Sequence, residues 1–162
     1  MICEQLGQLL ENEALTTDDS GTPSAIGYAL DCASAYADIG VGGKIWLVIK
    51  TTVAADFTSG NETYQFIVRT GTGLDGSYDI NAGVLDVAET DSMDGDDVRL
   101  DVAGDYIWRI QLPIDIKQRY IQLFKCFGGT TPTISISASL VSDLPPSDYS
   151  RQTHPAGPMS PP

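Results

Sequence analysis

The most regular pattern of apolar and polar positions lies in residues 119–141, RYIQLFKCFGGTTPTISISASLV. In its second half, apolar side chains alternate with small hydroxyl side chains, which is typical of a strand that buries one face. The apolar set is Ile134, Ile136, Ala138 and Leu140, and the hydroxyl set is Thr133, Ser135, Ser137 and Ser139. The first half is also strand-like, and a turn rich in glycine and threonine separates the halves. The stretch therefore predicts a hairpin of two strands.

The first strand of this hairpin, residues 119–127, is apolar on both faces. One face carries Ile121, Leu123 and Phe127, and the other carries Tyr120, Phe124 and Cys126. A sheet buries both faces only where something covers the second one, either a loop of the same chain or another subunit. The partner strand, residues 133–141, carries no charge. Because unprotected strands at a sheet edge pair readily with other chains, we expect this edge to invite partners.

Six further segments are strand-like, and runs containing Gly, Asp and Asn separate them. They are residues 25–33, 44–50, 62–70, 77–80, 84–90 and 104–112. No long amphipathic helix lies between them, which excludes the parallel α/β classes because their crossover helices are missing. The pattern predicts an all-β fold, a β-sandwich or jelly roll of about eight antiparallel strands, with its body over residues 25–143.

The two ends of the chain differ from this body. Residues 1–24 are expected to form an N-terminal arm, in which residues 1–15 are either a short helix or an extended segment. Leu6, Leu9 and Leu10 fit a helical stripe, but Gly7 weakens it. Residues 144–162 contain six of the nine prolines, so this segment predicts an extended, proline-rich tail. Its only apolar anchors are Leu144, Tyr149 and Met159.

Composition narrows the range of partners. The chain has 162 residues, of which 42% are hydrophobic, so it is long enough for one domain with a real core. Its formal net charge of −13 makes nucleic acid and anionic membranes poor partners.

The cysteines at positions 3, 32 and 126 match no metal or redox spacing. We expect Cys32 and Cys126 to be small buried hydrophobic residues; the alternative is one disulfide that leaves Cys3 over.

Few residues could support catalysis. The single histidine, His154, lies in the proline-rich tail, where it cannot be held beside a nucleophile or in a metal centre. A pair of carboxylates could act as in glycosidases. The tryptophans needed for a sugar platform, Trp46 and Trp108, instead fit strand patterns and are expected in the core. We therefore expect neither enzymatic activity nor a cofactor.

The acidic run DSMDGDD partly resembles a calcium-binding loop. Its candidate ligands are Asp91, Asp94, Asp96 and Asp97. With Gly95 at position six of the helical calcium loop, only part of the ligand pattern is present, and no helices flank it. Two interpretations remain open, a solvated turn whose charge discourages edge pairing and a calcium site in an irregular loop.

Residues 119–146, RYIQLFKCFGGTTPTISISASLVSDLPP, resemble the C-terminal strands of the jelly-roll cement, or decoration, proteins of short-tailed bacteriophage capsids. The shared features are an Arg-Tyr aromatic strand, a Gly-Thr-Thr-Pro-Thr turn, a serine-rich strand and a tail rich in Asp and Pro. The earlier segments KIWLVIK and NETYQFIVRTGT are similar in order and spacing. The resemblance covers roughly residues 25–146 and leaves the acidic stretch 86–105 and the tail 147–162 without a counterpart.

The resemblance implies a protein that binds the outer surface of an icosahedral shell. Such a protein would be made in the host cytoplasm and carried on the virion, with the major capsid protein and its own homodimer or homotrimer as partners. Candidate contact residues are Tyr120, Phe124, Ser135, Ser137, Leu144 and Tyr149. The alternative function is calcium-assisted binding of carbohydrate or a cell surface. A small hydrolase that uses Asp94 and Asp97 is a third hypothesis.

Overall fold

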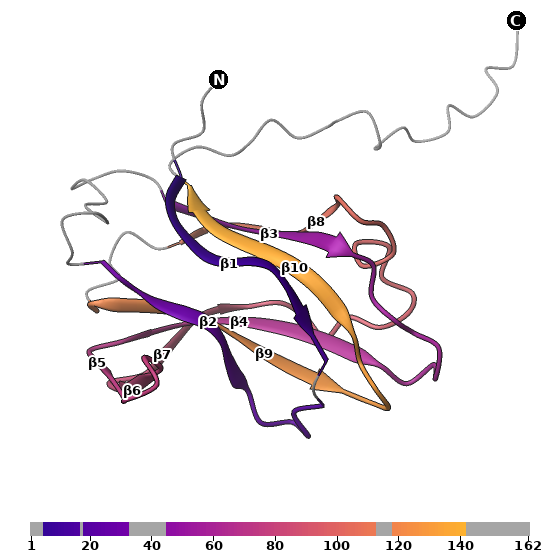
Figure 1. Ribbon diagram of the computed structural model, residues 1–162, viewed down its shortest axis with the longest axis horizontal. Helices are drawn as coiled ribbons and strands as arrows, with labels where there is room; N and C mark the ends of the chain where they lie inside the picture. The colour runs from indigo at the N-terminus through magenta and orange to yellow at the C-terminus, as the bar shows by residue number, and fades with distance from the viewer. Residues whose placement is uncertain (1–4, 17, 33–44, 113–117, 142–162) are drawn as a thin grey trace, which may run out of the picture.

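The computed structural model describes residues 5–16, 18–32, 45–112 and 118–141, with only the backbone for residues 5–8 (Figure 1). The described chain is all-β and contains no helix, so it also contains none long and apolar enough to cross a membrane. The described residues form ten strands: β1 Gln5–Leu15, β2 Ser24–Asp31, β3 Ile45–Val53, β4 Thr63–Gly71, β5 Gly73–Leu74, β6 Ile80–Ala82, β7 Leu85–Glu89, β8 Tyr106–Leu112, β9 Tyr120–Gly128 and β10 Ile134–Val141.

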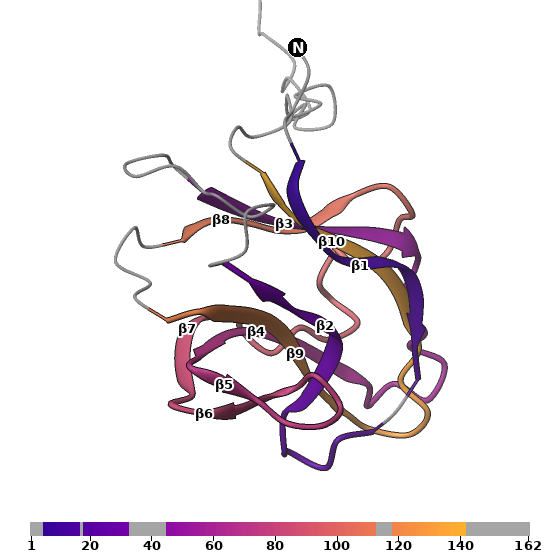
Figure 2. The same cartoon turned by 60° about the vertical axis from the view of Figure 1, so that its left-hand side comes forward.

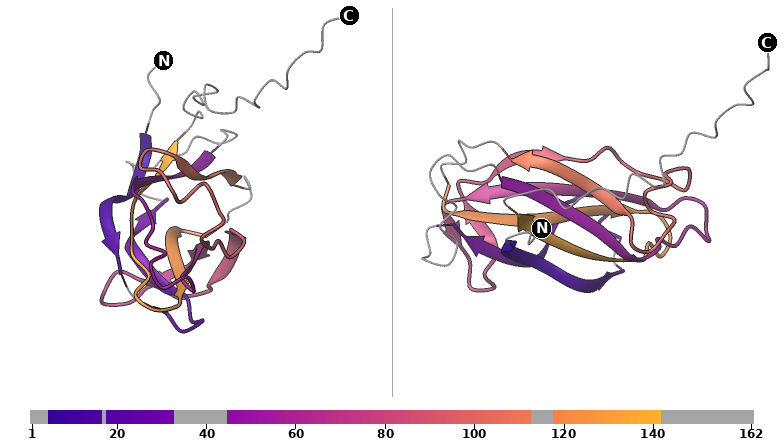
Figure 3. Two further views of the ribbon diagram at one scale, coloured as in Figure 1. Left: turned by 90° about the vertical axis from the view of Figure 1, so that its right-hand side faces the viewer. Right: turned by 90° about the horizontal axis from the view of Figure 1, so that it is seen from above.

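Eight of these strands form two four-stranded sheets that pack face to face (Figures 1 and 2). Sheet A has the order β1-β10-β3-β8 and sheet B has the order β2-β9-β4-β7, and every neighbouring pair is antiparallel. The short strands β5 and β6 pair separately as a ribbon. Viewed along the strands, the layers enclose one interior (Figure 3). The expected β-sandwich is confirmed at this level.

The hairpin predicted over residues 119–141 is wrong, because β9 and β10 belong to opposite sheets. The connection between them crosses from one layer to the other and includes Gly129 at φ 97° and Thr131 at φ 60°. A side chain at position 129 would meet the Asn61 carbonyl oxygen at 2.3 Å, so this crossing requires glycine. The alternation in β10 correctly indicated which face is buried but carried no information about the pairing partner.

As a result, β9 and β10 are each an interior strand of a different sheet. β10 pairs with β1 on one side and β3 on the other, and β9 pairs with β2 and β4. The uncharged segment 133–141 is therefore not the exposed edge that we expected. An uncharged strand fits this interior place because both of its backbone edges are already paired.

β1 is a strand of the sandwich. Of the two alternatives expected for residues 1–15, a short helix and an extended segment, the extended one holds over Gln5–Leu15. It lies at the edge of sheet A, and Leu9, Leu10 and Leu15 are buried in the core. Its pairing with β10 shifts register between Gln8 and Leu10 and again between Leu10 and Glu13. Such bulges break the period of two, which explains how adjacent leucines both face inward and why the spacing resembled a helical stripe.

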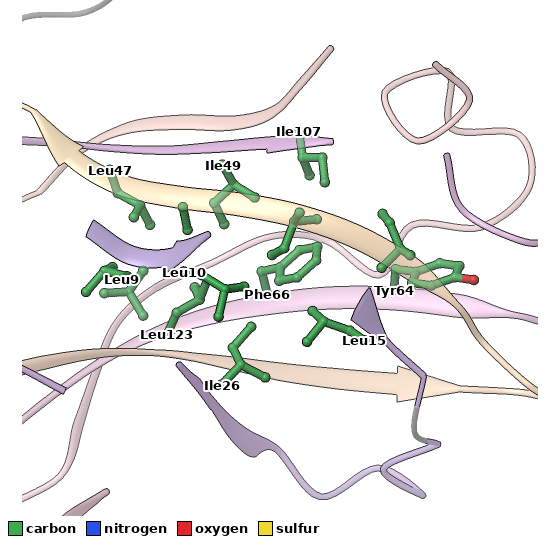
Figure 4. Close-up of a cluster of buried hydrophobic side chains, with 14 of the residues drawn as sticks. Leu9, Leu10, Leu15, Ile26, Leu47, Ile49, Tyr64, Phe66, Ile107 and Leu123 are labelled. Atoms are coloured by element: carbon green, nitrogen blue, oxygen red, sulfur yellow. The ribbon is translucent and has the colours of Figure 1, made fainter. Parts of the chain in front are cut away.

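One continuous hydrophobic core fills the space between the sheets (Figure 4). The four apolar side chains of β10 expected to face inward are at most 1% exposed. Aromatic rings pack edge to face beneath them, with centroid distances of 4.8 Å for Tyr64–Phe127 and 5.6 Å for Phe66–Phe127. Of the two tryptophans expected in the core, Trp108 packs against it, whereas Trp46 is half-buried outside this cluster.

The inward face of β9 also holds a charge. Lys125 pairs with Phe66 in the register of the inner face, and its side chain is 6% exposed. Its Nζ lies 2.8 and 2.9 Å from the two carboxylate oxygens of Asp19, which is 4% exposed. Asp19 also accepts hydrogen bonds from the Ser24 hydroxyl at 2.6 Å and the Phe127 amide at 2.9 Å. This buried ion pair joins the segment before β2 to the middle of sheet B.

The edges of the two sheets approach closely where β1 meets β2. Gly27 has φ 64°, and a side chain there would lie 2.1 Å from the Leu9 carbonyl oxygen. Glycine is therefore required by both the backbone conformation and the available space.

The buried ion pair generates a stability prediction. Lys125→Met should lower the free energy of unfolding by about 3–5 kcal/mol, because the Asp19 carboxylate stays buried without its cation. Adding Asp19→Asn should recover part of the loss, since the charge is removed and the amide oxygen can still accept from the Phe127 backbone amide, while the Ser24 hydroxyl can accept from the new NH2 group. Chemical denaturation measures both changes.

The control is Arg119→Met, which breaks the exposed pair between Arg119 and Asp31 and should leave the denaturation midpoint nearly unchanged. A Lys125→Met midpoint equal to that of this control would show that the buried pair contributes no more than an exposed one.

Candidate functional site

Part of the outer face of sheet B, over Gln122 and Phe124 of β9, is covered by the chain itself. Gln122 and Phe124 point outward from β9, yet they are only 0% and 7% exposed. The Arg69 guanidinium lies 4.6 Å from the centroid of the Phe124 ring and pairs with Asp86 at 2.5 Å. The β5–β6 ribbon lies below sheet B in Figures 1 and 2 and covers Gln122. Of the two covers considered from the sequence, a loop of the same chain covers Gln122, and a covering subunit stays a prediction.

Gln122 fastens the ribbon to the sheet with two hydrogen bonds. Its Oε1 accepts from the Ile80 amide at 3.0 Å, and its Nε2 donates to Asp79 Oδ1 at 3.0 Å. Because Gln122 is fully buried and both ends of its amide are used, the ribbon has one preferred position on β9.

The turn at the end of this ribbon, residues 75–79, presents an aromatic ring to solvent. The Oδ1 atom of Asp75 accepts from the amides of Ser77 at 2.7 Å and Asp79 at 3.0 Å. Between them, Tyr78 adopts φ 67° and remains 65% exposed. A bulky residue in this left-handed region costs about 1–2 kcal/mol, and such strain gathers at functional positions. The hydrogen bonds of Asp75 and Gln122 hold the turn in this conformation.

A second exposed tyrosine lies on β2. Ile26 pairs with Leu123 and Leu30 pairs with Ile121, so three residues of β2 lie opposite the single residue Gln122. Tyr28 is the middle residue of this bulge and is 75% exposed. Gln122 therefore lies opposite the bulge that carries Tyr28 and is hydrogen-bonded to the turn that carries Tyr78. We call Tyr28, Tyr78, Asp75 and Asp79 the tyrosine site.

The acidic candidates for calcium do not form a common site. Asp91, Asp94 and Asp96 are exposed, and Asp94 Oδ1 accepts from the Asp96 amide at 3.1 Å. Asp97 is hydrogen-bonded by Arg99, which holds the pKa of the Asp97 carboxyl below its ordinary value. Within the described part of the chain, no three Asp, Glu, His or Cys side chains are arranged to hold a metal ion.

The loop that carries these carboxylates is fastened by its apolar residues. Met93 and Leu100 are 2% and 0% exposed and belong to the core. The backbone of Met93 exchanges two hydrogen bonds with Tyr64, at 2.8 and 2.9 Å. The loop between β7 and β8 thus closes the core with its apolar side chains and directs its charge outward.

The expected contact residues lie in different places. Ser135 and Ser137 are on the outer face of sheet A, where Ser135 is 9% exposed and the Ser137 hydroxyl accepts from the Asn12 amide at 2.9 Å. Tyr120 is half-buried at the start of β9, and the Arg119 guanidinium lies 5.1 Å from its ring centroid. Phe124 is buried beneath Arg69, as described above. Leu144 and Tyr149, together with Met159 and His154, fall outside the described residues.

The cysteines show no activated thiol among the described residues. Cys32 and Cys126 are both free and half-buried, so the alternative of a disulfide between them is wrong. Burial, with the neighbouring Asp31 carboxylate, raises the pKa of the Cys32 thiol to about 11. Burial also raises the pKa of Cys126. Both side chains therefore remain protonated near neutral pH, and a protonated thiol is a poor nucleophile. Cys3 falls outside the described residues.

Sequence reasoning missed the tyrosine site. The run DGSYD is a typical turn composition, and a tyrosine inside a turn has no strand periodicity to place it in a core. That combination was the available signal for Tyr78. The GY step in the second strand indicated a bulge for Tyr28, because a glycine inside a strand often marks one.

Comparisons with known proteins give no family for the chain. No protein-family model matches it, and no curated protein matches it significantly.

The link between Gln122 and the ribbon can be tested by substitution. Gln122→Leu should free the ribbon, because the buried Ile80 amide loses its acceptor, at a cost of about 1–3 kcal/mol. Hydrogen exchange measured by mass spectrometry should then speed up over residues 72–82 and remain slow in β10. Gln111→Leu, a change at an exposed position of β8, is the matched control. Equal ribbon exchange in the two variants would contradict the role assigned to Gln122.

Proposed function

We propose that this chain is a capsid cement, or decoration, protein that binds the outside of an icosahedral phage shell. In this role it staples neighbouring major capsid proteins and stabilises the DNA-filled head. The proposal includes self-association as a homodimer or homotrimer and a place on the outer surface of the virion. It is supported by the resemblance of residues 25–146 to such proteins and by the order in which the strands pair.

The observation that carries the proposal is a nested strand pairing. Without the ribbon, eight strands remain, and they pair from the inside outward as β4 with β7, β3 with β8, β2 with β9 and β1 with β10. This is the pairing of one long hairpin that has been rolled into two layers. We assign it to the jelly roll, an eight-stranded fold built from two Greek keys. The same fold is the one that the resemblance implies.

Shell binding is physically suited to a rigid body of this kind. A ligand that binds only the assembled shell stabilises that shell by mass action. Contacts with two capsid subunits at once add avidity without requiring a large area for each contact. The acidic surface of the chain favours a basic counterpart on the shell and disfavours its DNA.

A second candidate function is the binding of carbohydrate or a cell surface. The observation that favours it is the tyrosine site, where the exposed ring of Tyr78 lies in one turn with Asp75 and Asp79. Aromatic rings beside carboxylates can stack on a sugar and accept hydrogen bonds from its hydroxyl groups. The calcium assistance expected from Asp91, Asp94, Asp96 and Asp97 has no assembled ligand set in the described residues.

The test of the leading proposal is co-sedimentation with undecorated capsids of the source virus. Bound protein should saturate at a fixed number of copies for each shell, and that number identifies the symmetry axis that is occupied. The capsids should also become more resistant to heat as copies bind. Absence of saturable binding would contradict the proposal, and retention on immobilised glycans would then favour the second candidate.

A further inference from the structure

We propose that the tyrosine site is the surface through which the chain docks on the shell. Its partner would be an apolar depression on the major capsid protein, rimmed by lysine or arginine side chains. This inference rests on the proposed function and adds the contact surface and the chemistry of its counterpart.

Exposure is the first argument. Among the described residues, Tyr28 and Tyr78 are the only aromatic side chains in the set of exposed large hydrophobic residues, at 75% and 65%. Tyrosine is enriched among the few interface residues that contribute most of the binding energy. It presents a large apolar ring with only two rotatable bonds and a hydroxyl group that can pair at the rim of a pocket. The two rings therefore suit the role of anchors.

Preorganisation is the second argument. Exposed loops usually lose conformational freedom on binding, which weakens affinity. Here Asp75 and Gln122 already hold the turn with four hydrogen bonds, and Tyr78 is kept at a strained positive φ. A strained bulky residue persists only where its surroundings over-determine it. The turn can therefore dock with little further ordering.

Charge identifies the partner. Asp75 and Asp79 flank Tyr78 in sequence, and the whole chain has a net charge of −13. Opposite charge around an aromatic anchor speeds encounter and fixes orientation, whereas like charge is unfavourable. A second copy of this chain would place the same carboxylates and the same excess charge against the site. A basic rim on a different protein is the complementary surface, so the shell is the occupant that we commit to.

The experiment compares variants in a binding titration with undecorated capsids. Tyr78→Gly removes the ring while favouring the positive φ of the turn, so the fold should be retained. Tyr28→Ala removes the second ring from an exposed bulge. Each variant should bind the shell at least about tenfold more weakly than the unmodified chain. Val98→Ala, at a position that is 72% exposed in the loop between β7 and β8, is the control and should bind normally.

A second variant tests the basic rim. Asp75→Asn removes the charge but keeps an oxygen that can accept from the amides of Ser77 and Asp79. Binding should weaken at low salt, and the affinity should depend less steeply on salt than that of the unmodified chain. If Asp75→Asn bound with the affinity of the unmodified chain at every salt concentration, the proposal of a basic rim on the capsid protein would be wrong.

The outcomes separate this inference from the function on which it rests. If the unmodified chain does not bind capsids, the proposed function fails and the docking surface fails with it. If it binds and both tyrosine variants bind equally well, only the docking surface is wrong. If those variants lose self-association in sedimentation velocity but keep shell binding, the occupant is a second copy, which overturns the assignment to the shell.

Discussion

The rest of the structure depends on the need to cover both faces of β9. Its inner face packs Ile121, Leu123 and Phe127 into the core, and its outer face carries the buried residues Gln122 and Phe124. Burial of apolar area contributes roughly 25 cal/mol for each Å² removed from water, so neither face can remain exposed at low cost. The strand therefore lies inside sheet B, beneath Arg69 and the β5–β6 ribbon. The outer cover then determines where Tyr78 is presented.

This requirement links the fold to the candidate site. The ribbon is short, and two strands of two and three residues would not be stable alone. It is held because Gln122 is buried with both ends of its amide bonded. The same residue lies opposite the bulge that carries Tyr28. One buried glutamine thus holds the turn that carries Tyr78 and lies opposite the bulge that carries Tyr28. A surface positioned in this way is rigid enough to act as a binding site without a separate ordering step.

Some of this architecture could be predicted from the sequence. The strands with clear alternation, such as Ile134–Val141, were placed with the correct face toward the core, because the period of two reports burial directly. Pairing could not be predicted, since the crossing between β9 and β10 depends on contacts that lie far away in sequence. The sequence left β1 open between a helix and an extended segment because its bulges produce a leucine spacing similar to that of a helix. Lys125 was passed over because its partner Asp19 lies 106 residues earlier in the chain.

The site was harder to predict than the fold for a physical reason. Exposed side chains leave no periodic signature. The turn that carries Tyr78 depends on local hydrogen bonds to Asp75 and also on bonds to Gln122, which lies far away in sequence. The acidic run attracted attention as a calcium loop, yet its carboxylates accept hydrogen bonds from nearby groups, such as the Asp96 amide and the Arg99 side chain. Composition alone does not show whether acidic groups converge on a common point.

The most direct test of the central claim is a cryo-electron microscopy reconstruction of capsids saturated with the protein. The account predicts that sheet B faces the shell, with the β5–β6 ribbon in contact and Tyr78 inserted in a capsid pocket that has basic side chains at its rim. A reconstruction in which the tyrosine site points to solvent while sheet A contacts the shell would contradict it.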